Sequence, residues 1–178
     1  GSNPLAPPLL EAMHDVLSNP VGNASSSHAI GQRSRARIEW AREQLAALVA
    51  AKPSEVVFTS GATEANNLIL RGITPVVDHI AISAGEHQSV SRVVEALADA
   101  GMIERHVVDL TPCGSVDLDA LDAALHGRRV GLVSIVAANS ETGVLNPVEE
   151  IAQRVHAAGG LLHCDATQWI GRLPWSMA

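Results

Sequence analysis

Short apolar runs alternate along the chain with longer segments whose apolar residues recur at helical spacing. This pattern predicts helices at Leu9–Leu17, Ile30–Val49, Thr63–Arg71, Ser89–Ala100, Leu118–Leu125 and Val148–Ala158. It predicts strands at Val56–Thr59, His79–Ser83, Arg105–Leu110, Val130–Val136 and Leu161–Cys164. Strands that alternate with helices are typical of βαβ units. The sequence therefore predicts an α/β fold with a mostly parallel sheet flanked by helices.

Polar residues that can bind or react follow four of the predicted strands. The segments are Ser-Gly-Ala-Thr at 60–63, Ala-Gly-Glu-His-Gln-Ser at 84–89, Ala-Ala-Asn-Ser-Glu-Thr-Gly at 137–143 and Asp-Ala-Thr-Gln at 165–168. In open α/β sheets, ligands bind outside the carboxyl ends of the strands. We therefore expect one binding site at this edge of the sheet.

Composition narrows the class of protein. A chain of 178 residues that is 47% hydrophobic and 17% charged is globular, and its length suits one domain or part of a larger one. A net charge of −7 argues against nucleic acid or an anionic membrane as the main partner. Two cysteines, Cys113 and Cys164, make no disulfide framework, so we expect a cytoplasmic location.

The residues at 60–63 open a predicted helix, where unpaired N–H groups attract anions such as phosphate. The alternative is an ordinary helix start at which Thr63 caps the chain. His87 follows a predicted strand, and its imidazole is suited to stacking on a planar ring or moving protons. The alternative is a solvent-facing loop histidine, because the chain has 8 histidines.

The remaining candidates lie after the last two predicted strands. Asn139 and Ser140 are suited to orienting a ligand, or simply to forming a turn. Asp165 ends a buried strand, so its carboxylate needs a cationic or hydrogen-bonding partner. Gln168 is either a hydrogen-bond partner for a ring substituent or an exposed loop residue. Together these groups suit a flat, charged ring that carries a phosphate, and pyridoxal phosphate fits better than a dinucleotide, because no G-x-G-x-x-G follows a strand.

Five segments carry a resemblance to a known family. They are GNASSSHAIGQ, VVFTSGATEANNLIL, GEHQSV, NSETGVLNPVEEIA and HCDATQWIGRLP. In their order and spacing they resemble cysteine desulfurases of the NifS/IscS type, in the class V aminotransferase superfamily. The resemblance implies the amino-terminal portion of a fold type I pyridoxal-phosphate enzyme, including part of its large domain.

The resemblance also implies roles for individual residues. The backbone of Ala62 and the backbone and hydroxyl of Thr63 would hold the cofactor phosphate. His87 would stack on the ring and assist proton transfer. Asp165 would pair with the ring nitrogen, and Gln168 would bind the phenolic oxygen.

The sequence departs from the family pattern at one cofactor contact. Where the family usually has a second asparagine, this chain has Ser140 after Asn139, so either that contact is lost or Asn139 supplies it. In the polar loop before His28, the resemblance implies that Asn23 binds the substrate carboxylate. We expect residues 1–28 to form an amino-terminal helix and entrance loop, and residues 29–178 to form an incomplete cofactor-binding domain.

The single lysine, Lys52, precedes the first predicted strand, away from the proposed site. We therefore expect a complementary C-terminal polypeptide to supply the Schiff-base lysine and the sulfur-accepting cysteine, in a homodimer-type assembly. The implied reaction takes sulfur from L-cysteine, giving alanine and an enzyme persulfide for a sulfur-acceptor protein, as in iron–sulfur cluster assembly. The alternatives are a non-catalytic cofactor-binding or scaffold remnant, and another class V lyase or aminotransferase such as a selenocysteine lyase.

Overall fold

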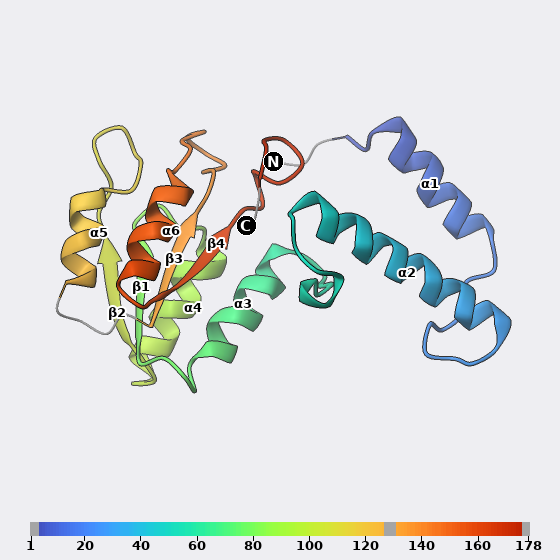
Figure 1. Ribbon diagram of the computed structural model, residues 1–178, viewed down its shortest axis with the longest axis horizontal. Helices are drawn as coiled ribbons and strands as arrows, with labels where there is room; N and C mark the ends of the chain where they lie inside the picture. Colours follow the sequence, from blue (N-terminus) through green and yellow to red (C-terminus); the bar gives the residue numbers. More distant parts are fainter. Residues whose placement is uncertain (1–3, 127–130, 176–178) are drawn as a thin grey trace. The chain divides into compact units, whose positions relative to one another are not determined.

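The computed structural model describes residues 4–126 and 131–175 (Figure 1). The chain divides into two compact units, and the division falls between Phe58 and Thr59. The first unit comprises the chain up to Phe58 together with Trp175, and the second unit runs from Thr59 to Pro174. The functional division expected after His28 is a different boundary and stays a prediction.

The first unit consists of two α-helices and a short 3₁₀ helix: α1 (Pro7–Ser18), α2 (Ala29–Leu48) and η1 (Pro53–Glu55). Both helices expected here from the apolar spacing are confirmed. His28 caps α2, because its ring Nδ1 accepts a hydrogen bond of 3.2 Å from the N–H of Gly31. This cap satisfies one of the N–H groups that a helix start leaves without a partner.

The first unit has almost no core of its own. Of its described residues, only Gly31 and Ala46 are buried, and α1 buries none. Ile38 and Leu45, on the apolar face expected for α2, remain 41% and 42% exposed. The two helices therefore present an apolar surface that this unit does not itself cover. Within the described residues, none of the helices combines the length and apolarity that crossing a bilayer requires.

The second unit is an α/β layer structure. Its elements are α3 (Ala62–Ile73), β1 (His79–Ser83), α4 (Gln88–Asp99), β2 (Glu104–Val108), α5 (Leu118–Leu125), β3 (Leu132–Val136), α6 (Val148–Ala157) and β4 (Leu161–Asp165). The strands form one parallel sheet in the order β2-β1-β3-β4. The predicted α/β fold is thus confirmed, and Val130, at the start of one predicted strand, lies outside the described residues.

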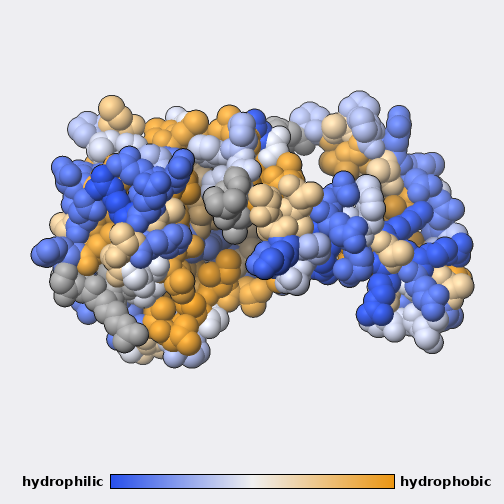
Figure 2. All heavy atoms as spheres, in the orientation of Figure 1, coloured by the Kyte–Doolittle hydropathy of each residue, from blue (hydrophilic) through white to orange (hydrophobic). Residues whose placement is uncertain are grey.

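Helices cover both faces of the sheet (Figure 1). Side chains that alternate along a strand point to opposite faces. Ala81 of β1 accordingly packs in the cluster that includes α5 and α6, whereas its neighbours Ile80 and Ile82 pack in the cluster that includes α3 and α4. Apolar side chains also remain at the surface, as Figure 2 shows in orange, and the exposed ones include Leu68 and Leu161.

The strand predicted at Val56–Thr59 is wrong. This segment has no strand partner among the described residues, and Val57 is 69% exposed. The guanidinium of Arg42 instead donates a hydrogen bond to the carbonyl of Val56 and lies 4.9 Å from the ring centroid of Phe58. A β-branched and aromatic run favours a strand only where a neighbouring strand offers a ladder of hydrogen bonds.

Candidate functional site

The candidate site lies where α3 and α4 begin and where β1, β3 and β4 end. Parallel strands bring these carboxyl ends to one edge of the sheet. Direct contacts tie the edge together, since Asn66 of α3 bonds both Ser89 of α4 and Asp165 of β4. The sequence expectation that the segments around Thr63, His87 and Asp165 gather at one edge agrees with this arrangement.

The start of α3 provides backbone donors. Gly61 precedes the helix with extended backbone and provides no side-chain cap, and Ala62 and Thr63 form its first turn. Thr63 therefore does not cap the helix, which was the alternative to an anion site. The carboxylate of Glu64 is turned back to Ser60, accepting from its N–H at 2.7 Å and its hydroxyl at 2.5 Å. These bonds lower the pKa of Glu64.

Asp165 ends β4 and is 7% exposed. One carboxylate oxygen accepts from the amide of Asn66 at 2.9 Å, and the other accepts from the N–H and hydroxyl of Thr167 at 3.1 and 2.6 Å. Burial alone would raise the pKa of Asp165, but the hydrogen bonds from Thr167 and Asn66 outweigh it and lower the pKa. The buried carboxylate is therefore ionised at neutral pH.

His87 stands at the start of α4 as its N-cap and is exposed. Its ring Nδ1 accepts from the N–H of Ser89 at 3.1 Å and lies 2.8 Å from the Ser89 hydroxyl oxygen. That oxygen also accepts from the amide of Asn66 at 2.9 Å. A chain of hydrogen bonds thus runs from His87 through Ser89 and Asn66 to Asp165.

Sequence reasoning missed Asn66 and Ser89, which are 4% and 8% exposed. A signal for Asn66 is present in the sequence. It lies four residues before Leu70, which is fully buried, and residues at this spacing share one face of a helix. A polar residue on the buried face of a helix needs a buried partner, and the partner here is the site itself.

Glu86, next to His87 in the chain, is a half-buried carboxyl group at the same edge of the sheet. Its Oε1 accepts from the hydroxyl of Ser83 and from the N–H of Val136, both at 2.6 Å. The carboxyl group therefore joins the end of β1 to the end of β3. Burial, together with the negative charge of Asp165, raises the pKa of Glu86 to about 7, although the hydrogen bonds oppose this shift.

Asn139 serves as a turn residue. Its Oδ1 accepts from the N–H groups of Glu141 and Thr142 at 2.9 and 3.0 Å, and its amide donates to the carbonyl of Gly85 at 3.2 Å. Both ends of the side chain are thereby used to hold the loop after β3 against the loop before His87. Ser140 is exposed beside it. Contacts of either residue with a cofactor stay predictions.

Gln168 and Asn23 belong to different units of the chain. Gln168 follows β4 by three residues, and its Oε1 accepts from Arg172 at 2.7 Å. Asn23 belongs to the first unit, where its side chain accepts from the N–H of Ser25 at 2.9 Å in a local turn. The predicted roles of both residues in ligand binding remain predictions.

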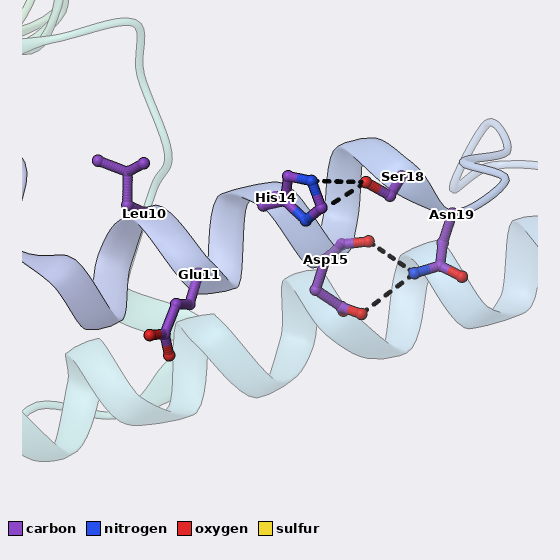
Figure 3. Close-up of a pocket in the computed structure, with 6 residues that line it drawn as sticks. All are labelled: Leu10, Glu11, His14, Asp15, Ser18 and Asn19. Carbon is purple, nitrogen blue, oxygen red and sulfur yellow. Dashed lines mark hydrogen bonds between the residues drawn. The ribbon is translucent and has the colours of Figure 1, made fainter.

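The hollow drawn in Figure 3 lies elsewhere, in the first unit, and is lined by α1 and the residue after it. Its hydrogen bonds are local: the amide of Asn19 donates to Asp15, and the hydroxyl of Ser18 lies 3.5 Å from the ring nitrogens of His14 (Figure 3). None of its lining residues is a predicted site residue.

Comparison with known proteins places the chain in a family. The family model described as "Aminotransferase class-V" matches residues 1–178. The chain therefore belongs to the class V aminotransferase family. The family expected from the sequence motifs is confirmed.

The curated relatives are named as cysteine desulfurases. The chain is 42% identical to "Cysteine desulfurase IscS" of Anaeromyxobacter sp. (strain Fw109-5) over 174 residues, which cover 95% of this chain and 43% of the relative. It is 38% identical to "Cysteine desulfurase" of Nostoc sp., covering 96% of this chain and 43% of the relative. The chain thus spans less than half of the length of these relatives.

Solved structures give the same picture. A chain titled "NifS-like protein" superposes with a TM-score of 0.91 at 32% identity, covering 98% of this chain and 49% of that one. DndA from Streptomyces lividans superposes with a TM-score of 0.78 at 39% identity, covering 93% of this chain and 46% of that one. The parallel sheet flanked by helices is thus the fold of NifS-like proteins.

Proposed function

We propose that this chain is the amino-terminal, cofactor-binding part of a pyridoxal-phosphate-dependent cysteine desulfurase. The observation that carries the proposal is the state of Asp165: a buried carboxylate, ionised, at the end of β4 and linked through hydrogen bonds to His87. Relatives that share this fold are named cysteine desulfurases. Such a carboxylate is suited to pair with a protonated ring nitrogen.

The residues at the sheet edge fit pyridoxal phosphate in three respects. Ala62 and Thr63 begin α3 without a side-chain cap, so their N–H groups are suited to bind a phosphate. His87 is exposed and its Nδ1 is already bonded, which leaves the ring free to lie against a planar group. Asp165 supplies the negative charge, and Gln168 follows it at a distance of three residues in the chain.

When bound, pyridoxal phosphate supplies an electron-withdrawing ring that stabilises negative charge at the substrate Cα. In this proposal Thr63 donates its hydroxyl and N–H to the phosphate. Asp165 keeps the ring nitrogen protonated, because its low pKa holds the carboxylate ionised. His87 covers one face of the ring and moves a proton at Nε2. Asn139 and Ser140 line the site, and Asn139 holds the loop that presents His87.

In this proposal the Schiff-base lysine and the nucleophilic thiol lie outside these 178 residues. The only lysine of the chain, Lys52, lies in the first unit, where its N–H bonds the Glu55 carboxylate. Burial, together with the charges of Glu86 and Asp165, raises the pKa of Cys164 to about 12, so its thiol is protonated at neutral pH. Cys113 is exposed in the turn before α5 and has no contact with the site that the structure describes.

The assembled enzyme would take sulfur from L-cysteine, release alanine and pass the sulfur to an acceptor protein. Asn23 would bind the substrate carboxylate. A homodimer-type assembly, a cytoplasmic location and a role in iron–sulfur cluster assembly belong to this proposal, and the names of the relatives support the last of these.

The proposal is tested by titrating the purified protein, with any polypeptide that co-purifies, with pyridoxal phosphate while its absorption is recorded. Asp165→Asn is expected to weaken binding by about tenfold to a hundredfold, since a hydrogen bond to a charged group contributes about 1.5–3 kcal/mol. Asp109→Asn is the matched control, because Asp109 follows β2 but is exposed. Equal binding by both variants and the unmodified protein would remove Asp165 from the site.

A second candidate is a non-catalytic cofactor-binding or scaffold protein. Pyridoxal phosphate binding without release of sulfide from L-cysteine, in the presence of every co-purifying polypeptide, would support it. Substrate preference distinguishes another class V lyase from a cysteine desulfurase. Turnover of selenocysteine but not of cysteine would favour a selenocysteine lyase.

A further inference from the structure

We infer that Asn66 and Ser89 are positioning residues, which orient Asp165 and His87 as one unit and hold the neutral His87 ring with its proton on Nε2. The inference rests on the proposed function for its role in the reaction, but its geometry is independent of any cofactor. Asn66 and Ser89 are buried polar side chains of helices α3 and α4, and the inference gives both of them a role in the site.

The orientation of the Asn66 amide is fixed by Asp165. The Asn66 atom 2.9 Å from the Asp165 carboxylate must be nitrogen, because the amide oxygen has no proton to donate and would be repelled by the negative charge. The same nitrogen lies 2.9 Å from the hydroxyl oxygen of Ser89. Both of its protons are therefore used, one for each neighbour.

The direction of the remaining hydrogen bonds follows from this assignment. The Ser89 oxygen accepts from Asn66, so its own proton is free to point at Nδ1 of His87, 2.8 Å away. The backbone N–H of Ser89 also donates to Nδ1, at 3.1 Å. Nδ1 can only accept in this arrangement, and a neutral imidazole with an accepting Nδ1 carries its proton on Nε2.

These hydrogen bonds determine which ring nitrogen of His87 can donate a proton. The proton that His87 can give is on Nε2, and the ring cannot receive one at Nδ1 without losing its bonds to Ser89. The chain also ties the position of His87 to that of Asp165, although they lie on different elements. Because Asn66 and Ser89 are buried, water does not compete strongly for these hydrogen bonds.

The test reads the tautomer directly. Protein labelled with ¹⁵N-histidine is purified with whatever polypeptide accompanies it, and two-bond ¹H–¹⁵N correlations of the imidazole rings are recorded at neutral pH without cofactor. His87→Gln identifies the His87 signals by their loss. We expect an unprotonated, accepting Nδ1 and a protonated Nε2.

Variants then test the two links. Ser89→Ala and Asn66→Ala are each expected to move the His87 nitrogen signals toward a mixture of tautomers, and Ser89→Thr to restore the original pattern. The matched controls are Ser91→Ala and Asn67→Ala. The Ser91 hydroxyl bonds the backbone carbonyl of His87 and the Asn67 amide bonds that of Thr63, so neither bond involves the imidazole ring or the Asp165 carboxylate. These controls are expected to leave the pattern unchanged.

A wild-type spectrum with the proton on Nδ1 overturns the inference, even if no variant folds. An unchanged His87 pattern in both Ser89→Ala and Asn66→Ala overturns it as well. Since the measurement needs no cofactor, failure of the protein to bind pyridoxal phosphate would remove the proposed function and leave the tautomer result standing.

Discussion

The amide of Asn66 in α3 donates a hydrogen bond of 2.9 Å to the carboxylate of Asp165 at the end of β4, across 99 residues of sequence. This bond joins the helix that offers backbone donors to the strand that offers a buried negative charge. It also keeps Asp165 ionised, because a hydrogen bond to the charged form of a carboxyl group favours that form.

Asn66→Ala is expected to raise the pKa of Asp165, since the variant loses one of the bonds that oppose the effect of burial. It is also expected to destabilise the fold by about 1–3 kcal/mol, the cost of leaving a buried polar group without a partner. The Asp165 carboxyl ¹³C shift, followed over a pH titration, measures the first effect and urea unfolding the second. An unchanged titration of Asp165 would show that Thr167 alone sets its ionisation.

Glu86→Gln is expected to change how stability depends on pH. The pKa of Glu86 is raised from 4.5 to about 7 in the folded protein, so the wild type loses stability as pH rises through this window. Glutamine does not titrate, and its oxygen is able to accept the bonds from Ser83 and Val136. Relative to the wild type, the free energy of unfolding of the variant should therefore increase by on the order of 1–3 kcal/mol between pH 4.5 and 7.

Urea unfolding of both proteins at pH 4.5, 6 and 8 measures this difference. Burial lowers the pKa of His163, beside Ser134, and this adds stability as pH rises. Both proteins contain His163 and Asp165, however, so their contributions cancel in the difference. A constant difference at all three pH values would mean that the pKa of Glu86 is the same in the folded and unfolded protein, which contradicts the raised value.

Thr63→Val removes a hydroxyl and keeps the branched shape of the side chain. If Thr63 binds the cofactor phosphate, the variant should bind pyridoxal phosphate about two- to tenfold more weakly, because one hydrogen bond contributes about 0.5–1.5 kcal/mol. Pyridoxal, which has no phosphate, is the control ligand, and its affinity should not change. Equal loss for both ligands would point to a general disturbance of α3.

The two cysteines should differ in reactivity. Cys113 is exposed, whereas Cys164 is half-buried in β4 with its pKa raised to about 12. Because the thiolate is the reactive form, iodoacetamide at pH 8 should modify Cys113 much faster than Cys164. Peptide mass spectrometry over a time course measures both rates. Faster modification of Cys164 would contradict its burial and reopen its role as a nucleophile.

Local patterns predicted most of the second unit. β1 and α5 have the bounds expected from the sequence, because the apolar run of β1 and the helical spacing of α5 coincide with burial on the sheet. The segment Val56–Thr59 is rich in residues that favour strands, but it has no partner strand in the described part of the chain, so its composition alone gave a wrong prediction. Strand formation depends on neighbours that a local pattern does not contain.

The site was predictable only in part for the same reason. His87 and Asp165 follow strands, so strand topology places them at one edge, whereas Thr63 lies in the first turn of α3 and follows no strand. Asn66 and Glu86 act through contacts made across 99 and 50 residues of sequence. Such contacts depend on how the helices pack, which single-residue patterns do not specify.

The most direct test of the central claim is borohydride reduction of the purified protein, with all co-purifying polypeptides, in the presence of pyridoxal phosphate, followed by intact-mass and peptide mass spectrometry. The proposal predicts a reduced pyridoxyl group on a lysine outside these 178 residues, and weaker labelling in Asp165→Asn. Specific labelling of Lys52, the only lysine of this chain, or no labelling of any polypeptide, would contradict it.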